Sequence, residues 1–309
     1  MKTSSPTAKA SIGTYVLAFL AMLFWGMSFV WVKIVYQYYD PLTTIYLRLV
    51  LSSLLLIGLA KIMGIPIKPR PEDTKAFFFL AFLEPFAYFI GESFGLKLVS
   101  SSVAAIMIAT IPIVTPVMAH FKLGERLSVM NYIGIIVSFG GILLMILKKD
   151  LSFEYNPVGI LLLLLAVFSG AYYTIQLKPL SNTYHPVTII IAMNVIGSFY
   201  FLPFFMYFEF ADFIQVRPNL ELITAMGELI LFSSIMALMF FVIVVERIGA
   251  SRTAVFTNFI PVVTVIAAWY LLPEEVITLK MLIGIFVVTL GVFVAQIRVH
   301  STNTEQSNT

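Results

Sequence analysis

Apolar residues along the chain gather into ten long stretches that are separated by short polar segments. A transmembrane helix needs roughly 20 apolar residues to cross about 30 Å of hydrocarbon, and each stretch is close to this length. The run of residues 160–167 is continuously apolar, whereas a membrane β-strand alternates apolar and polar positions. The pattern predicts an all-α integral membrane protein with ten transmembrane helices, over residues 12–35, 41–63, 75–98, 102–121, 129–147, 157–177, 186–208, 222–245, 252–272 and 279–297.

Proline opens three of the predicted helices, in the pairs Asp40-Pro41, Asn156-Pro157 and His185-Pro186. Proline suits the first turn because its missing N–H would have no partner within the helix there. Asp40 and Asn156 are expected to cap their helices with their side chains. The polar ends of the chain, residues 1–11 and 298–309, are expected to be short disordered tails.

Lysine and arginine are unevenly divided between the two sides of the predicted membrane. If the N-terminus is inside, the inner segments hold twelve of these residues and the outer segments six, with Arg48 lying inside a span. Cytoplasmic segments of membrane proteins are enriched in Lys and Arg. We therefore expect both termini, and so both tails, on the cytoplasmic side of a plasma or inner membrane.

The chain contains an internal repeat. Residues 97–125 align without gaps on residues 246–274, at a shift of 149 positions, and the earlier spans align more weakly at shifts of 144 and 145. Each unit holds five spans, an odd number, so the second unit enters the membrane from the opposite side. The matched positions include Ile111-Pro112 on Ile260-Pro261, Gly26 on Gly170, and Pro41 on Pro186.

This arrangement predicts two inverted five-helix repeats, residues 12–149 and 150–297. Inverted repeats are the architecture of alternating-access transporters, whose substrate site lies at the repeat interface near the membrane midplane. The alternative is an ancient duplication that was kept only for packing. Transport explains the pattern better, because a purely structural protein gains nothing from two-sided pseudo-symmetry.

Three segments carry further information: Phe24-Trp25-Gly26-Met27-Ser28-Phe29, Leu47-Arg48-Leu49, and Leu96–Met145 with its Leu123-Gly124-Glu125-Arg126-Leu127. Together with the ten-span repeat, they resemble the EamA-type transporters of the drug/metabolite transporter superfamily, over nearly the whole chain. The second half departs from the pattern at Ser169-Gly170 and at Pro273-Glu274-Glu275.

The resemblance implies secondary transport or export of small metabolites. Substrates in this superfamily range over amino acids, sugars, nucleosides and toxic cations, so the resemblance does not identify the substrate of this protein. It also implies that the fifth and tenth spans form the outer rim, with a homodimer contact there. We expect an exporter of amino acids or related compounds that works in a lipid bilayer by alternating access and is coupled to protons.

Small residues in the fifth and tenth spans are expected to let these two helices pack closely. They are Gly134, Gly140, Gly141, Gly284 and Gly291.

Composition narrows the class of protein. The chain has 309 residues, of which 60% are hydrophobic and 11% charged, with a mean hydropathy of +0.98. A net charge of +3 gives no reason to expect a nucleic-acid partner, and no cysteine and only three histidines give none to expect a metal or cofactor. An H-E-x-x-H motif, paired aspartates and a phosphate-binding loop are all absent. We do not expect an enzyme. The alternative is an intramembrane enzyme that acts on a lipid-soluble substrate.

Four ionisable residues fall inside the predicted spans, where a charge costs roughly 2.5–3.5 kcal/mol on insertion. At 1.5 Å per residue, Arg48, Glu92 and Glu228 lie about 9–10 Å from the outer surface, and Glu84 lies about 15 Å deep. The functional interpretation is that all four, Arg48, Glu84, Glu92 and Glu228, line a cavity and bind a charged substrate group or relay protons. Alternatively, Arg48 pairs with Glu92 or Glu84 to fix helix packing, and Glu228 extends outward.

Proline interrupts three spans. Pro85 follows Glu84 and is expected to kink the third span, because it removes the backbone bond to Ala81. Pro112 and Pro261 fall at matching depths in the two halves, and with Pro85 they are the predicted hinges. An acid beside a kink near the midplane can exchange protons with each side in turn, so Glu84 is the predicted proton-coupling residue.

Aromatic and amide side chains complete the predicted substrate site. Trp25, Tyr88, Tyr172 and Tyr173 fall within spans and can line an apolar cavity of the kind that binds small molecules, although packing explains any single ring more simply. Asn258 is an uncharged polar residue at depth that meets either substrate or a neighbouring helix. The predicted substrate-binding residues are Arg48, Glu84, Glu92, Trp25, Tyr88, Tyr172 and Asn258.

Overall fold

The computed structural model describes residues 12–123, 128–148, 154–249, 253, 255–273, 275 and 277–295. The secondary-structure elements in this part of the chain are all helices. Both predicted tails, Glu125 and Glu274 lie outside the described residues. In chain order the helices are α1 (Ile12–Val35), α2 (Pro41–Met63), η1 (Pro71–Asp73), α3 (Thr74–Ala81), η2 (Phe82–Ala87), α4 (Tyr88–Leu98), α5 (Ser101–Ile108), α6 (Ile111–Leu123), α7 (Val129–Ile146), α8 (Pro157–Ser181), α9 (Pro186–Phe204), η3 (Phe205–Glu209), α10 (Phe210–Phe213), α11 (Leu220–Glu228), η4 (Leu229–Ala237), α12 (Leu238–Ile248), η5 (Val255–Asn258), α14 (Phe259–Leu271) and α15 (Leu279–Ala295).

The ten predicted spans are present. Eight helical segments are long and apolar enough to cross a membrane, and two shorter apolar helices, Phe256–Leu271 and Leu279–Ala295, complete the set within the described residues. Several spans are composite. The third is α3–η2–α4, the fourth α5–α6, the seventh α9–η3, the eighth α11–η4–α12 and the ninth η5–α14. The predicted fold class, an all-α membrane protein, is confirmed.

The two halves run in opposite directions. At one end of the molecule, Arg247 of α12 donates a hydrogen bond to Thr14 at the start of α1 (Nη1–Oγ1 3.3 Å). At the same end, Lys178 of α8 donates to the carbonyl of Val245 in α12 (3.0 Å). The start of α1 and the end of α8 therefore lie together. Because α1 and α8 are the first spans of the two halves, the repeats are inverted as predicted.

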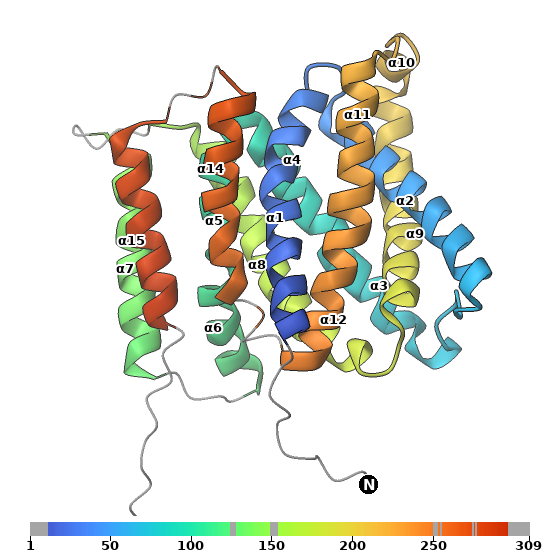
Figure 1. Cartoon of the computed structure of the whole chain (residues 1–309), viewed down its shortest axis with the longest axis horizontal. Helices are drawn as coiled ribbons and strands as arrows, with labels where there is room; N and C mark the ends of the chain where they lie inside the picture. Colours follow the sequence, from blue (N-terminus) through green and yellow to red (C-terminus); the bar gives the residue numbers. More distant parts are fainter. Residues whose placement is uncertain are drawn as a thin grey trace, which may run out of the picture.

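Helix packing exchanges partners between the halves, as a two-fold axis requires. α1 packs against α11, η4, α12 and α14 of the second half, and α8 packs against α4 and α6 of the first. α2 packs on α9 and α7 packs on α15, so the second and fifth spans meet their own counterparts. In Figure 1, α7 and α15 stand side by side at one edge of the molecule. The first four spans of each half therefore build the centre of the fold.

Glycines set the spacing between α7 and α15. A side-chain carbon added at Gly134 would lie 2.4 Å from the carbonyl oxygen of Gly291, and one at Gly284 would lie 3.4 Å from that of Gly141. The predicted packing role is confirmed for these four residues. For Gly140 the prediction is wrong, because nothing lies within 4 Å of a side chain placed there.

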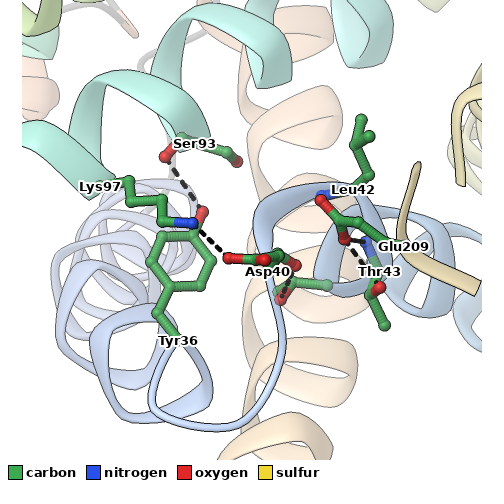
Figure 2. A network of polar contacts seen from close by, with 8 residues as sticks. Tyr36, Asp40, Leu42, Thr43, Ser93, Lys97 and Glu209 are labelled. Atoms are coloured by element: carbon green, nitrogen blue, oxygen red, sulfur yellow. Dashed lines mark hydrogen bonds and ion pairs between the residues drawn. The ribbon is translucent and has the colours of Figure 1, made fainter. Parts of the chain in front are cut away.

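The start of α2 is capped by a residue from a distant helix. Glu209 of η3 accepts hydrogen bonds from the backbone amides of Leu42 (3.1 Å) and Thr43 (2.6 Å), and from the Thr43 hydroxyl (2.7 Å) (Figure 2). A carboxylate at a helix N-terminus satisfies unpaired N–H groups and interacts favourably with the helix dipole. This contact joins the second half of the chain to the first.

Asp40, the predicted cap of α2, makes no side-chain capping bond. Figure 2 shows it pointing toward Lys97 of α4, with which it forms an ion pair. The prediction for Asp40 is wrong, because a longer carboxylate side chain from η3 already occupies the helix end. The prediction for Asn156 is confirmed, since its Oδ1 accepts from the Val158 amide at 2.9 Å.

A second carboxylate joins the halves in the same way. Glu275, between α14 and α15, accepts a hydrogen bond from the amide of Ser101, the first residue of α5 (2.6 Å). The starts of α2 and α5 lie at the predicted outer end. At that end, Glu209 and Glu275 of the second half accept hydrogen bonds from the first turns of α2 and α5 of the first half.

Candidate functional site

A cavity lies between the two halves of the protein. It holds about 840 Å³ of space not filled by protein atoms, its open mouth included. Eight of the ten spans line it, the first four of each half, and the described residues of α7 and α15 contribute nothing to its walls. This is the location that inverted-repeat transporters use for substrate.

Five of the seven predicted substrate-binding residues line this cavity, and they are Arg48, Glu84, Glu92, Trp25 and Tyr88. All five come from the first three spans. The ring of Trp25 packs against Phe241 of α12, with ring centroids 5.0 Å apart. The first half therefore contributes the charges, and aromatic rings from both halves close around them.

Arg48 is held by uncharged groups. It is 4% exposed, and its Nε and Nη2 donate hydrogen bonds to Ser234 Oγ (3.2 Å) and Ser233 Oγ (3.3 Å). Its guanidinium carbon also lies 4.8 Å from the centre of the Phe89 ring. Among the described residues, no carboxylate lies within 4 Å of this cation. The alternative in which Arg48 pairs with Glu92 or Glu84 to fix helix packing is therefore not the arrangement found.

The two acids have different surroundings. Glu92 accepts a hydrogen bond from the hydroxyl of Tyr88, one turn earlier in α4 (3.0 Å). Glu84 lines the cavity, half-buried, and has no hydrogen bond or ion pair with any described residue. A carboxyl group open to the cavity can meet a solute or exchange a proton.

Glu84 breaks the third span. Its backbone is extended (φ −141°, ψ 120°) within the π-helical segment η2, directly before Pro85. The predicted kink is therefore present. The eighth span has a π-helical segment, η4, at the corresponding place in the second half, and it carries Ser233 and Ser234. Such segments are rare within helices and are frequent at functional sites.

Two predicted residues lie beside the cavity and not in its wall. The Tyr172 ring packs edge-on against Phe79 (centroids 5.8 Å), while its neighbour Tyr173 lines the cavity. The Oδ1 atom of Asn258 is buried without a hydrogen-bond partner among the described residues, and its neighbour Thr257 lines the cavity. A shift of one residue turns a side chain by about 100° around a helix.

Glu228 is half-buried at the end of α11 and is not among the residues that line the cavity, so the expectation that it lines the cavity is wrong. Ser233 and Ser234 were not predicted from the sequence. Carrying the shift of 149 back beyond the aligned residues 97–125 would have pointed to them, because it places position 233 on Glu84.

The cavity wall follows the repeat. Seven pairs of lining residues are separated by the shift of their own spans, which is 144 for the first span, 145 for the second and 149 for the third and fourth, and two of these pairs combine a charged with a neutral residue. The pairs are Phe29 with Tyr173, Leu49 with Asn194, Glu84 with Ser233, Phe89 with Leu238, Glu92 with Phe241, Ile108 with Thr257, and Ile111 with Ile260. All three charged lining residues belong to the first half.

The two remaining predicted hinges sit at matching breaks. In the fourth span, α5 ends at Ile108 and α6 begins at Ile111, one residue before Pro112. In the ninth, the 3-10 turn η5 gives way to α14 at Phe259, two residues before Pro261. Both breaks adjoin residues of the cavity wall.

Comparison with known proteins gives the same picture. The EamA-like transporter family matches this chain twice, over residues 12–147 and 157–296. An uncharacterized transporter of Archaeoglobus fulgidus is 28% identical over 281 residues, which cover 91% of this chain and 97% of the relative. The uncharacterized transporter YoaV of Bacillus subtilis is 25% identical over 280 residues, which cover 88% of this chain and 92% of the relative.

The fold is also found among solved structures. A crystal structure of a protein superposes with a TM-score of 0.67 at 15% identity, covering 93% of this chain and 97% of the other. At this identity the likeness concerns the fold alone. The two family matches fall on the two inverted halves that enclose the cavity, and together they span almost the whole chain. This multi-pass membrane protein belongs to the EamA-like transporter family.

Proposed function

We propose that this protein is a secondary transporter that exports small metabolites, such as amino acids or related compounds, by alternating access at the interface of its two halves. The observation that carries the proposal is the cavity between the halves, where the cation Arg48 has no carboxylate partner among the described residues. A cavity lined equally by inverted repeats can open to either side by the same movement in reverse.

The chemistry of the lining supports an amino-acid-like substrate. A substrate carboxylate would supply the negative charge that Arg48 lacks, and charge-assisted hydrogen bonds of this kind are among the strongest in proteins. A substrate ammonium group would meet Glu84 or Glu92. The rings of Trp25 and Tyr173 offer apolar contact area for the rest of the molecule.

Glu84 is the candidate for proton coupling. It has no bonded partner among the described residues, it faces the cavity, and the span breaks at its own backbone. A change of protonation there can alter how the two parts of the span meet. Pro85, Pro112 and Pro261 are the proposed hinges, since each stands at a break next to the cavity wall.

We further propose that both termini face the cytoplasm, and that the exposed faces of α7 and α15 form a homodimer contact. The Lys and Arg distribution supports the orientation. The large apolar side chains on these helices, such as Ile136 and Phe286 at 71% and 68% exposure, face lipid or a second copy.

The test is transport by purified protein in liposomes, offered pools of amino acids and other metabolites with and without a pH gradient. We expect the liposomes to accumulate an amino acid to a level that depends on the pH gradient. The amino acid recovered from them should be chemically unchanged. Uptake that is the same with and without the pH gradient would contradict the proposal of proton coupling. Chemical conversion of the solute would replace transport by an enzymatic function. Arg48→Ala protein is the matched negative control.

A further inference from the structure

The hydroxyl groups of Ser233 and Ser234 lie where a carboxylate would be expected. A buried arginine in a protein is normally paired with an acid, because an uncompensated charge is costly to bury. Here the guanidinium of Arg48 bonds to two serines that are 2% and 9% exposed, both on η4 of the opposite half. Their two bonds fix the plane of the guanidinium without supplying negative charge.

The repeat shows what stands at this place in the other half. If the shift of 149 is carried back from residue 97 along the third span, Ser233 falls on Glu84, and both residues lie in π-helical segments, η4 and η2, of equivalent spans. One half therefore has an acid at this position and the other a hydroxyl. An acid at position 233, within the reach of the present hydrogen bond, would form an ion pair with Arg48. The neutral residue leaves the cation available to the cavity.

We propose that Ser233 and Ser234 are positioning residues that orient Arg48 and keep it unpaired, so that the cavity selects solutes that carry a carboxylate. This inference rests on the proposed function and names the substrate class of the same cavity. The guanidinium has more N–H donors than the two serine bonds use, and those left over can form a forked pair with a carboxylate. Lysine could not replace it, because its ammonium lacks this planar fork.

The first test needs no substrate. Arg48→Met and Ser233→Asp are made singly and together, and thermal unfolding is measured in detergent. If the serine lies against Arg48, Ser233→Asp creates a buried ion pair. Arg48→Met should then lower the melting temperature by roughly 5 °C more in the Ser233→Asp protein than in the wild type, since breaking a buried pair is strongly destabilising. If Arg48→Met lowered the melting temperature equally in the wild-type and Ser233→Asp proteins, the placement of Ser233 against Arg48 would be overturned.

The second test measures selection. Binding of L-leucine and L-phenylalanine is compared with binding of their amides, which keep the side chain and ammonium but lack the carboxylate. Binding is followed by the change in tryptophan fluorescence, to which Trp25 of the cavity wall contributes. The wild type should bind each acid at least tenfold more tightly than its amide. Ser233→Asp should abolish this preference, whereas Ser233→Thr, which keeps the hydroxyl, should retain it. Paired Ser233→Ala and Ser234→Ala changes should weaken acid binding tenfold and leave amide binding unchanged.

Ser198→Ala serves as the matched control, because this serine on α9 is not among the cavity-lining residues and, within the described part of the chain, donates its hydrogen bond to a carbonyl of its own helix (Val195 O, 2.7 Å). A preference for the acids that survives Ser233→Asp would overturn the positioning role while leaving the proposed transport of amino acids standing. A wild type that binds neither the acids nor the amides, or both alike, would overturn the substrate class, even with the thermal coupling present.

Discussion

Arg48 is the cation among the described residues that line the cavity. It lies seven residues into α2, on the inside of the bundle, and it spans the interface to reach two hydroxyls of η4. The cost of burying its charge is offset in part by these bonds and by the ring of Phe89 beneath it. Glu92 and Glu84 line the same cavity but lie beyond ion-pair distance, and we propose that a solute carboxylate supplies the remaining compensation.

Replacing Arg48 with alanine should therefore reduce transport roughly thirtyfold to hundredfold or more, because losing a charge-assisted hydrogen-bonded pair costs about 2–3 kcal/mol. The initial rate of uptake into liposomes measures this. Since no described acid is paired with Arg48, neutralising Glu92 or Glu84 as well should give no rescue. Recovery of transport in either double variant would mean that an internal ion pair forms during the cycle.

Glu84→Gln should keep substrate binding and exchange but lose the response to a pH gradient. Glutamine preserves size and hydrogen bonding and cannot titrate. Counterflow at equal pH measures exchange, and accumulation under an imposed gradient measures coupling. Glu92→Gln is the matched control, since Glu92 shares the cavity but is bonded to Tyr88. A Glu84→Gln protein that still accumulates solute against the gradient would contradict the coupling role. One with a lowered melting temperature and no exchange would assign the residue a structural role.

At the scale of the helices, the number and rough limits of the spans could be predicted because each needs a long apolar stretch, and the break at Glu84 because proline cannot continue a helix. What could not be predicted is the direction of single side chains next to these breaks. The π-helical segment η4 holds an extra residue per turn, and η5 is a tighter 3-10 turn. Each changes the rotation along the span, so Thr257 lines the cavity and not Asn258.

The capping of α2 also lay beyond sequence analysis, because it joins residues 166 positions apart. Glu209→Ala should lower the stability of the protein by about 1–2 kcal/mol, since it leaves buried amides at the helix start without a partner. Asp40→Asn should cost no more than about 1 kcal/mol, because its ion pair with Lys97 is half-exposed. Thermal unfolding of the two variants in detergent compares them. An Asp40 effect as large as that of Glu209 would contradict this assignment.

At the scale of the whole molecule, the inverted repeat was visible in the sequence because matched residues at the breaks, such as Ile111-Pro112 and Ile260-Pro261, are constrained by the same geometry twice. The hydroxyl pair on η4 was harder to find. It has no sequence motif of its own, and its meaning depends on Arg48, which lies 185 positions from Ser233 in the chain.

The orientation in the membrane is a property of the whole chain and can be tested directly. With cysteines introduced at Ser4 or Ser307, an impermeant maleimide added to intact cells should leave the protein unlabelled, because we expect both termini to be cytoplasmic. The absence of native cysteine gives a clean background. Labelling after permeabilisation is the positive control, and labelling of intact cells at either position would reverse the predicted orientation.

The charge on only one half of the cavity has a consequence for how such a protein could arise. Two identical copies of the first half would surround the solute with two arginines and four glutamates, and two copies of the second half with none. A symmetric assembly of either present half would thus have either an acidic or a neutral interior. The mixed cavity requires two different halves. The cavity is therefore asymmetric in charge, and a solute with one anionic end has a single favourable orientation in it.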